Sequence, residues 1–298
     1  MKDRNYLSNT REFRNKFKTI YCDLNNLKKI QKKIILFKPE IIIHLASQPI
    51  VSKSYNDPQK TFDTNIIGTV KIFEIVKKIS SVKKIIIFTS DKVYKNNYKS
   101  LTENSNLGGL DPYSASKSCQ DIISQSYNYS FIEKKMIILR SGNIIGGGDW
   151  GKNRLMPDII KGLKNKNVIK IRSINSTRPW LHILDVINAI LLMITKNKNK
   201  DITTIYNLSP KNREITVKKI LDIIKKNLPQ KSLKIKILKK KFKEMKFLKL
   251  SSKKINNELG WNSRINIVKG ILLTIRLYNS DKKSLFFETK NQISNFFD

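Results

Sequence analysis

The sequence has little cysteine or histidine, few acidic residues and no long apolar run. Two cysteines and two histidines among 298 residues, with no CxxC pair and no histidine cluster, argue against a disulfide framework and a metal site. The longest apolar stretches, such as residues 186–194, fall far short of the roughly 20 residues that a membrane span needs. The N-terminal residues show no signal-peptide core. These absences favour a reduced, cytoplasmic protein without metal or membrane contact.

The balance of charge is strongly basic, with 59 Lys and Arg against 23 Asp and Glu, a formal net charge of +36. Such a balance can indicate a nucleic-acid partner. Here the lysines are spread along the whole chain, mostly as pairs beside apolar segments, and no basic tail is present. Together with the heavy use of Ile and Asn, this distribution indicates a compositional bias of the source genome. A nucleic-acid role is therefore disfavoured.

The first half of the chain alternates short β-branched runs with helical patterns. Strands are predicted at 17–24, 40–47, 83–90 and 136–146, and helices at 25–38, 58–79 and 113–133. Strands that alternate regularly with helices along the chain predict βαβ units. The fold class predicted is therefore α/β, with a doubly wound, parallel, Rossmann-like sheet.

The second half changes character. We predict a loop and helix within 146–165, a strand, turn and helix within 168–195, a strand at 203–210, and helices within 214–228 and 253–261. The predicted domains are residues 1–145, with 183–210 returning to them, and a smaller α/β lobe made mainly of residues 146–298. Two such lobes leave a cleft over the strand ends, where doubly wound sheets bind ligands.

Tyr113 and Lys117 stand four residues apart at the start of a predicted helix, where Asp111 before Pro112 is a helix-start signal. This spacing places both side chains on one helical face. An ammonium beside a phenol favours the phenolate, so we expect Lys117 to lower the pKa of Tyr113. The alternative is an ordinary surface tyrosine with a lysine one turn further along.

Several other motifs accompany this pair: residues 44–69, TSDKVY at 89–94, 107–117, 140–150, 177–182 and 248–261. With them, over about residues 19–278, the chain resembles the extended branch of the short-chain dehydrogenase/reductase family and, within it, the CDP-glucose 4,6-dehydratases. Lys92 after Asp91 is the most specific feature, because the related dTDP-glucose dehydratases carry glutamate there. Ser90 departs from the usual threonine.

The resemblance implies an NAD-dependent lyase that converts CDP-glucose to CDP-4-keto-6-deoxyglucose for deoxysugar and surface-polysaccharide synthesis. Tyr113, supported by Lys117, would take the proton of the sugar 4-hydroxyl, to which Ser90 is hydrogen-bonded. A neutral Lys92 would then remove the C5 proton, and a protonated Asp91 would donate to the leaving C6 hydroxyl. Two alternatives remain: an epimerase or other dehydratase of the same family, or a catalytically inert remnant.

Further residues follow from the same resemblance. The cofactor-binding residues would be Asp23, Ala46, Gln48, Asn65, Thr89, Tyr113 and Lys117, and the substrate-binding residues Ser90, Asn143, Arg154 and Arg178. Asp23 has a second interpretation as a helix N-cap, and His44 is predicted to be structural. The resemblance also implies a homodimer formed through the helices near 60–79 and 113–133.

A strand followed by GxxGxxG and a helix, with which the family begins, occurs nowhere in the sequence. Residues 1–16 look like the loop before the family's third strand, so we expect the first βαβ unit to be absent. Apolar edges of the sheet would then be exposed, and the pyrophosphate would lack its helix N-terminus. A late-assigned start codon, a gene fragment and a second polypeptide that supplies the unit remain as explanations.

Overall fold

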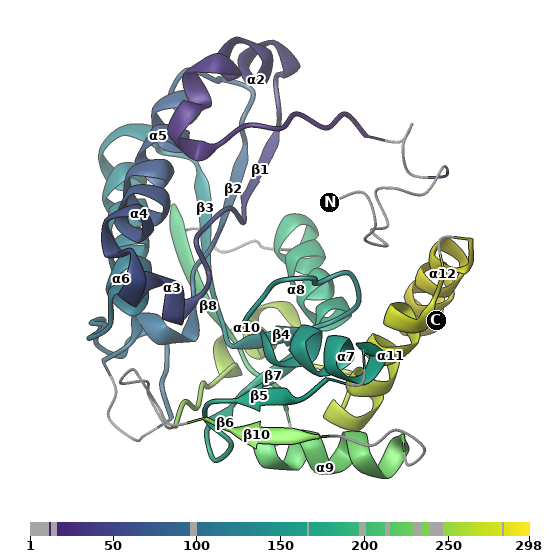
Figure 1. Cartoon of the computed structure of the whole chain (residues 1–298). Helices are drawn as coiled ribbons and strands as arrows, with labels where there is room; N and C mark the ends of the chain where they lie inside the picture. The colour runs from purple at the N-terminus through teal and green to yellow at the C-terminus, as the bar shows by residue number, and fades with distance from the viewer. Residues whose placement is uncertain are drawn as a thin grey trace.

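A four-stranded parallel sheet forms the centre of one lobe in the computed structural model (Figure 1). Its strands lie in the order β1 (Ile41–His44), β2 (Lys84–Phe88), β3 (Lys135–Ser141) and β8 (Thr203–Leu208). The structure describes Glu12 and residues 17–95, 100–165, 167–196, 201–211, 215–228, 234–238, 247–281 and 283–298. The interpretation of residues 1–16 as a loop therefore falls almost wholly outside the described residues.

Helices cover both faces of this sheet (Figure 1). One face carries α4 (Pro58–Phe62), the π-helical turn η3 (Asp63–Ile67), α5 (Gly68–Val76), α6 (Pro112–Tyr127) and the π-helical turn η5 (Asn128–Ile132). The other carries α8 (Ile183–Thr195) and α10 (Lys253–Leu259). Along β2, Ile85 and Ile87 pack in the first layer and Ile86 in the second, as the alternation of a strand requires. The predicted doubly wound α/β fold is confirmed.

The second lobe is built from short two-stranded sheets. Parallel pairs join β4 (Asn143–Ile145) to β7 (Trp180–His182) and β5 (Ile169–Ile171) to β10 (Ile235–Ile237), and an antiparallel pair joins β6 (Thr177–Arg178) to β9 (Ile215–Thr216). Its helices are α7 (Leu155–Asn165), α9 (Val217–Asn227), α11 (Ile267–Asn279) and α12 (Ser284–Phe297). Ile159, Ile220 and Ile271 are fully buried in a core shared by β4, β5, β7, α7, α9 and α11.

The strand predicted at 17–24 is wrong. Residues 18–23 adopt no regular structure, and the 3-10 helix η2 (Leu24–Lys29) and helix α2 (Gln31–Phe37) follow them. A β-strand needs a neighbour for its N–H and C=O groups, and within the described ranges β1 pairs with β2 alone. Without such a neighbour, Phe17, Ile20 and Tyr21 remain 46%, 47% and 93% exposed.

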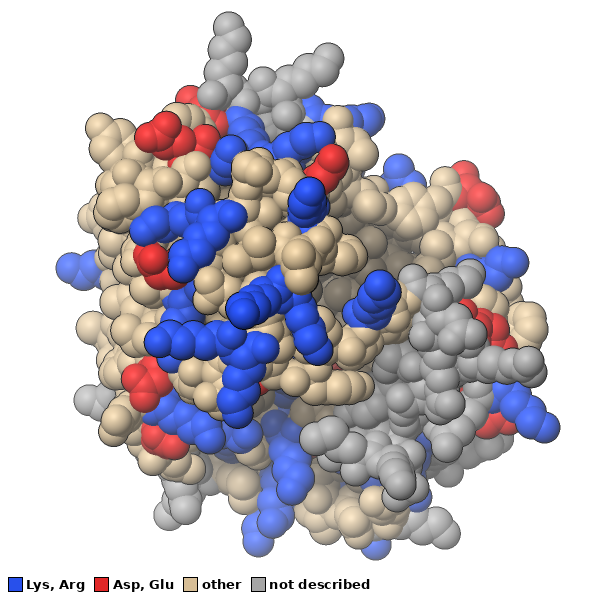
Figure 2. All heavy atoms as spheres, turned by 90° about the horizontal axis from the view of Figure 1, so that it is seen from above, with Lys and Arg blue, Asp and Glu red and all other residues tan. Residues whose placement is uncertain are grey.

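The surface reflects the basic composition. Figure 2 shows many Lys and Arg side chains, with acidic ones dispersed among them, on the face seen from above. Lys28, Lys29, Lys32 and Lys33 around η2 and α2 are all exposed. Within the part of the chain that the structure describes, no helix combines the length and apolarity needed to cross a membrane.

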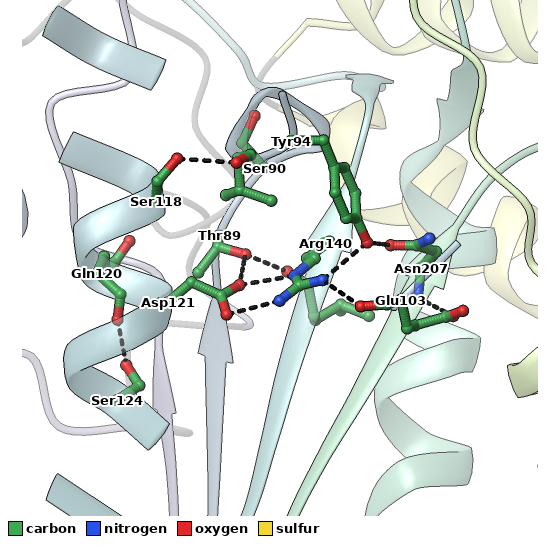
Figure 3. A network of polar contacts seen from close by, with 12 residues as sticks. Thr89, Ser90, Tyr94, Glu103, Ser118, Gln120, Asp121, Ser124, Arg140 and Asn207 are labelled. Carbon is green, nitrogen blue, oxygen red and sulfur yellow. Dashed lines mark hydrogen bonds and ion pairs between the residues drawn. The ribbon is translucent and has the colours of Figure 1, made fainter. Parts of the chain in front are cut away.

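A buried ion pair fixes helix α6 against the sheet (Figure 3). The Arg140 guanidinium on β3 donates through Nε and Nη2 to both carboxylate oxygens of Asp121 on α6, each at 2.7 Å. Arg140 also donates to the Tyr94 hydroxyl at 2.9 Å, and Tyr94 donates to Asn207 on β8 at 2.6 Å. Thr89, directly after β2, donates to Asp121 at 3.3 Å. One network thus joins α6 to three strands.

Arg140→Met should therefore be strongly destabilising. It leaves the Asp121 carboxylate buried without its counter-ion, which costs about 3–5 kcal/mol in free energy of unfolding. Urea denaturation measures the loss. The control is Glu40→Gln at the Lys83–Glu40 pair, whose side chains are 72% and 65% exposed, respectively; there we expect less than about 1 kcal/mol. Similar losses in both variants would contradict the role given to the buried pair.

Candidate active site

A cavity of about 470 Å³ lies where the carboxyl ends of the parallel strands meet the second lobe. Leu45 and Ser47 follow β1 at its wall, and Ser141 ends β3 there. The carboxyl edge of an open parallel sheet is where such folds bind ligands, because the loops there diverge to opposite faces. Among the described residues, no group of three or more His, Cys, Asp or Glu side chains could hold a metal ion.

Most of the site residues predicted from the sequence line this one cavity. They are Thr89, Ser90, Asp91, Lys92, Tyr113, Lys117, Asn143, Arg154 and Arg178. They come from the end of β2, the first turns of α6, the start of β4, the residue before α7 and strand β6. Residues up to 89 positions apart in sequence, Thr89 and Arg178, are thus brought to a shared surface.

The other predicted cofactor-binding residues are not among those that line the cavity. Asp23 is exposed and caps η2, accepting from the backbone N–H two residues further along at 2.8 Å. Ala46 is exposed on the loop after β1. Gln48 donates its backbone N–H to the Asn65 side chain at 2.7 Å, and Asn65 donates to Ser116 on α6 at 2.8 Å. Gln48 and Asn65 therefore brace the loop after β1 against α6.

The polar residues after β2 are buried and mutually bonded. Ser90 caps the short 3-10 helix η4 (Asp91–Val93) by accepting from the Lys92 N–H at 3.2 Å. The same hydroxyl donates to the Asp91 carboxylate at 3.0 Å. Ser90, Asp91 and Lys92 are at most 6% exposed, and Lys92 Nζ lies 5.9 Å from the centroid of the Tyr113 ring. A hydroxyl, a carboxyl and an amine thus face the tyrosine across the cavity.

The pKa of Tyr113 moves in the direction opposite to the expected one. Burial raises the pKa of this phenol to about 12, and the Asp91 and Asp111 carboxylates act in the same direction. A hydrogen bond with Ser90 and the charge of Arg154 oppose the shift without reversing it. Helical spacing places the phenol correctly on α6, but it carries no information about desolvation, which dominates here.

Lys117 is buried to 2% exposure on α6. Its ammonium donates to Gln120 Oε1 at 2.8 Å and to the Phe88 carbonyl at 3.2 Å. Both acceptors are neutral. Burial lowers the pKa of Lys117 to about 7, so the side chain changes its charge close to neutral pH.

Cationic side chains line the second-lobe side of the cavity. Arg154 forms an ion pair with Asp149 at 2.9 Å and remains about 39% exposed, whereas Arg178 is 4% exposed. Arg172 and Lys170, which belong to none of the sequence motifs, also line this side. The only local signal was the alternation of β5, whose middle residue Lys170 is exposed. A cluster of guanidinium and ammonium groups suits a phosphate-bearing ligand.

The comparisons with known proteins agree with this geometry. The model of a family described as GDP-mannose 4,6 dehydratase matches residues 2–274. The CDP-glucose 4,6-dehydratase of Salmonella typhimurium is 33% identical over 255 residues, which span 81% of this chain and 71% of that protein. The dTDP-glucose 4,6-dehydratase of Haemophilus influenzae is 26% identical, over 86% of this chain and 80% of that protein.

Solved structures share the fold at lower identity. A dTDP-glucose 4,6-dehydratase from Streptomyces venezuelae, solved with NAD and TYD bound, has a TM-score of 0.78 at 20% identity and covers 89% of this chain and 80% of its own. A UDP-glucose 4-epimerase from Thermus thermophilus, in complex with NAD, has a TM-score of 0.80 at 19% identity, over 93% and 89% of the two chains.

The pKa of Lys117 predicts a pH-dependent stability difference between the parent chain and Lys117→Met. Below pH 7 the parent carries a buried charge; between about pH 7 and 10.5 the folded lysine is neutral while the unfolded one is charged. The folded state therefore binds fewer protons in this window, so the parent gains stability relative to the variant as pH rises. Urea denaturation at pH 6.5 and 9.5 measures the difference. Lys83→Met, at an exposed site, is the control. A stability difference between the parent and Lys117→Met that is the same at both pH values would refute the lowered pKa of Lys117.

Proposed function

This chain belongs to the GDP-mannose 4,6-dehydratase family, and on that premise we propose that it is an NAD-dependent lyase acting on CDP-glucose. The reaction removes one water and yields CDP-4-keto-6-deoxyglucose, a precursor for deoxysugars of surface polysaccharides. The observation that carries the proposal is the placement of Ser90, Asp91 and Lys92 beside Tyr113 in one cavity. The 33% identity to a CDP-glucose 4,6-dehydratase supports the choice of nucleotide.

The residues at the α6 side of the cavity fit the nicotinamide-ribose end of NAD. Tyr113 and Lys117 line the cavity, and two of the three ammonium N–H groups of Lys117 are directed to Gln120 and Phe88. The third suits a ribose hydroxyl. We assign no residue to the pyrophosphate, because GxxGxxG does not occur in the sequence. When bound, NAD supplies the acceptor that takes the hydride from C4 and returns it to C6.

In the first half of the proposed reaction, Tyr113 takes the proton from the sugar 4-hydroxyl. Ser90, whose side chain is hydrogen-bonded to Tyr113, holds that hydroxyl in line with the phenolate. Because the phenol has a pKa of about 12 in the chain alone, the phenolate depends on nearby positive charge. Lys117 and Arg154 supply it. Loss of hydride from C4 then leaves a ketone.

In the second half, the C4 ketone makes the C5–H acidic, and the Lys92 amine removes that proton. Asp91, protonated and oriented by Ser90, donates its proton to the departing C6 hydroxyl, which leaves as water. Return of hydride to C6 completes the 6-deoxy group as the Lys92 ammonium, whose protons exchange with solvent, protonates C5. Tyr113 then releases the proton of the 4-hydroxyl and Asp91 takes one up through solvent, which restores the site. The sum is loss of one water with no net oxidation.

Asn143, Arg154 and Arg178 hold the nucleotide diphosphate in this proposal. They line the second-lobe side of the cavity, where Arg154 is also close enough for its charge to act on Tyr113. Guanidinium groups donate pairs of hydrogen bonds to phosphate oxygens in a fixed plane. The free cysteines Cys22 and Cys119 agree with a reducing cytoplasm as the place of the reaction.

We also propose a homodimer formed through the helices at residues 60–79 and 113–133. Large apolar side chains stay exposed on them: Ile67, Ile122, Tyr129 and Phe131 at 46%, 52%, 85% and 58%. A second copy could bury this face through a two-fold axis.

Asp91→Asn should reduce water loss strongly while leaving the fold intact. Incubating the 298-residue chain with CDP-glucose and NAD⁺ should give a product about 18 Da lighter by mass spectrometry. An amide cannot serve as the acid, so we expect the rate to fall about 10²–10⁴-fold. The matched control is Asp222→Asn, at an exposed position on α9.

Two outcomes would overturn the dehydratase. Conversion of the sugar to an epimer without loss of mass would instead identify an epimerase. Equal rates for Asp91→Asn and the parent would remove Asp91 from the chemistry.

Ile122→Lys should weaken the dimer. A lysine ammonium in the middle of an apolar interface carries a desolvation cost of several kcal/mol that no partner charge offsets. Analytical ultracentrifugation should show the parent as a dimer and the variant shifted toward monomer, whereas Val268→Lys, exposed on α11, should sediment like the parent. A monomeric parent chain would sink the proposal.

A further inference from the structure

A buried chain of hydrogen bonds runs from Lys117 away from the cavity. Lys117 donates to Gln120 Oε1 at 2.8 Å, and Gln120 Nε2 donates to Thr69 Oγ1 at 2.9 Å. Thr69 Oγ1 also lies 2.9 Å from His44 Nε2. Lys117, Gln120, Thr69 and His44 are at most 3% exposed. The chain connects α6 to α5 and then to strand β1.

The direction of every bond in this chain is determined by Thr69. Its hydroxyl donates to the Asn65 carbonyl at 2.8 Å, and a hydroxyl has one proton and two lone pairs. Toward both Gln120 and His44 it must therefore accept. His44 is then the neutral tautomer protonated on Nε2, in agreement with a pKa lowered to about 4 by burial and by the charge of Lys117.

The same count of hydrogen-bond donors and acceptors determines the orientation of the Gln120 amide. In the reversed orientation its NH₂ group would face the Lys117 ammonium, donor against donor. Its oxygen would face a Thr69 hydroxyl whose proton is already committed to Asn65. Gln120 consequently presents a carbonyl oxygen to Lys117 and cannot turn it away without breaking two bonds.

We propose that Gln120, locked by Thr69 and His44, is a positioning residue that holds the Lys117 ammonium charged and directed at the cavity. The role rests on the proposed function, in which Lys117 acts as a cation beside Tyr113. A neutral acceptor suits this task, because a carboxylate in its place would cancel the positive charge that the phenolate needs. The groups that share the surroundings of Lys117 are His44 on β1, Tyr113 on α6, Asp91 and Lys92 after β2, and Arg154 before α7.

The first test is a double-mutant cycle in urea that uses no substrate and no cofactor. The variants are Gln120→Leu, Lys117→Met and their combination. A hydrogen bond to a charged donor should couple the two sites by about tenfold or more in the unfolding equilibrium constant at pH 6. At pH 9.5, where Lys117 is neutral, the coupling should shrink. Coupling below about twofold at pH 6 would overturn the inference.

The second test is the pH profile of turnover. Gln120→Leu should lower kcat about tenfold or more at pH 7 while KM stays within threefold of the parent value. The fall of kcat at high pH, which is the basic limb of the profile, should move to lower pH by about one unit because Lys117 loses its proton more readily. Gln120→Glu, which restores an acceptor and adds charge, should move that limb to higher pH. Gln292→Leu, a hydrogen-bonded glutamine of 6% exposure on α12, controls for losing a buried amide and should leave the limb in place.

The two failures are distinguishable. Coupling at pH 6 without any water loss from CDP-glucose would support the positioning of Lys117 and count against the proposed function alone. Water loss with an unmoved basic limb in Gln120→Leu would retain the proposed function and remove Gln120 from it.

Discussion

The burial of α6 against the sheet is the constraint on which the site depends. Arg140 and Asp121 form a bidentate ion pair with almost no exposure to solvent, and this pair holds α6 in place against β3. Tyr113 and Lys117 lie on the same helix, toward its N-terminus. Desolvation by the packed helix and strands, more than any neighbouring charge, then moves the pKa values of both side chains. Anchoring and tuning therefore arise from one packing arrangement.

The pKa values of Tyr113 and Lys117 make each of these side chains depend on neighbouring groups for the charge state that the reaction needs. The phenol alone is a weak acid, with a pKa of about 12, and the lysine alone is poised near pH 7. The proposed reaction needs a phenolate at Tyr113 and a charged ammonium at Lys117, and neither side chain alone holds that state firmly at neutral pH. A phenolate is stabilised by a nearby cation, and a buried cation is stabilised by a hydrogen-bond acceptor. Gln120 and the Phe88 carbonyl satisfy the lysine from behind. The cavity-facing side of the cation is thereby left for the reaction.

Sequence reasoning succeeded where a local pattern carries the physics. The β-branched run at 83–90 predicted the strand β2, and the polar residues that follow it line the cavity at the carboxyl edge of the sheet. It failed at residues 17–24, because strand formation depends on a neighbour and not on propensity alone. It also missed the bonds from Lys117 to His44, since Thr69 and Gln120 stand 51 positions apart and match no motif. His44, predicted to be structural, is buried on β1 and bonded to Thr69.

The central claim, dehydration with internal return of hydrogen by Tyr113, Asp91 and Lys92, is tested most directly by isotope transfer. CDP-glucose carrying deuterium at C4 would be converted by the 298-residue chain with NAD⁺, and the product examined by mass spectrometry and NMR. The account predicts that the C4 deuterium appears at C6 of the same sugar, while C5 takes up hydrogen from solvent. Deuterium that remains at C4, or that is lost to solvent, would contradict it.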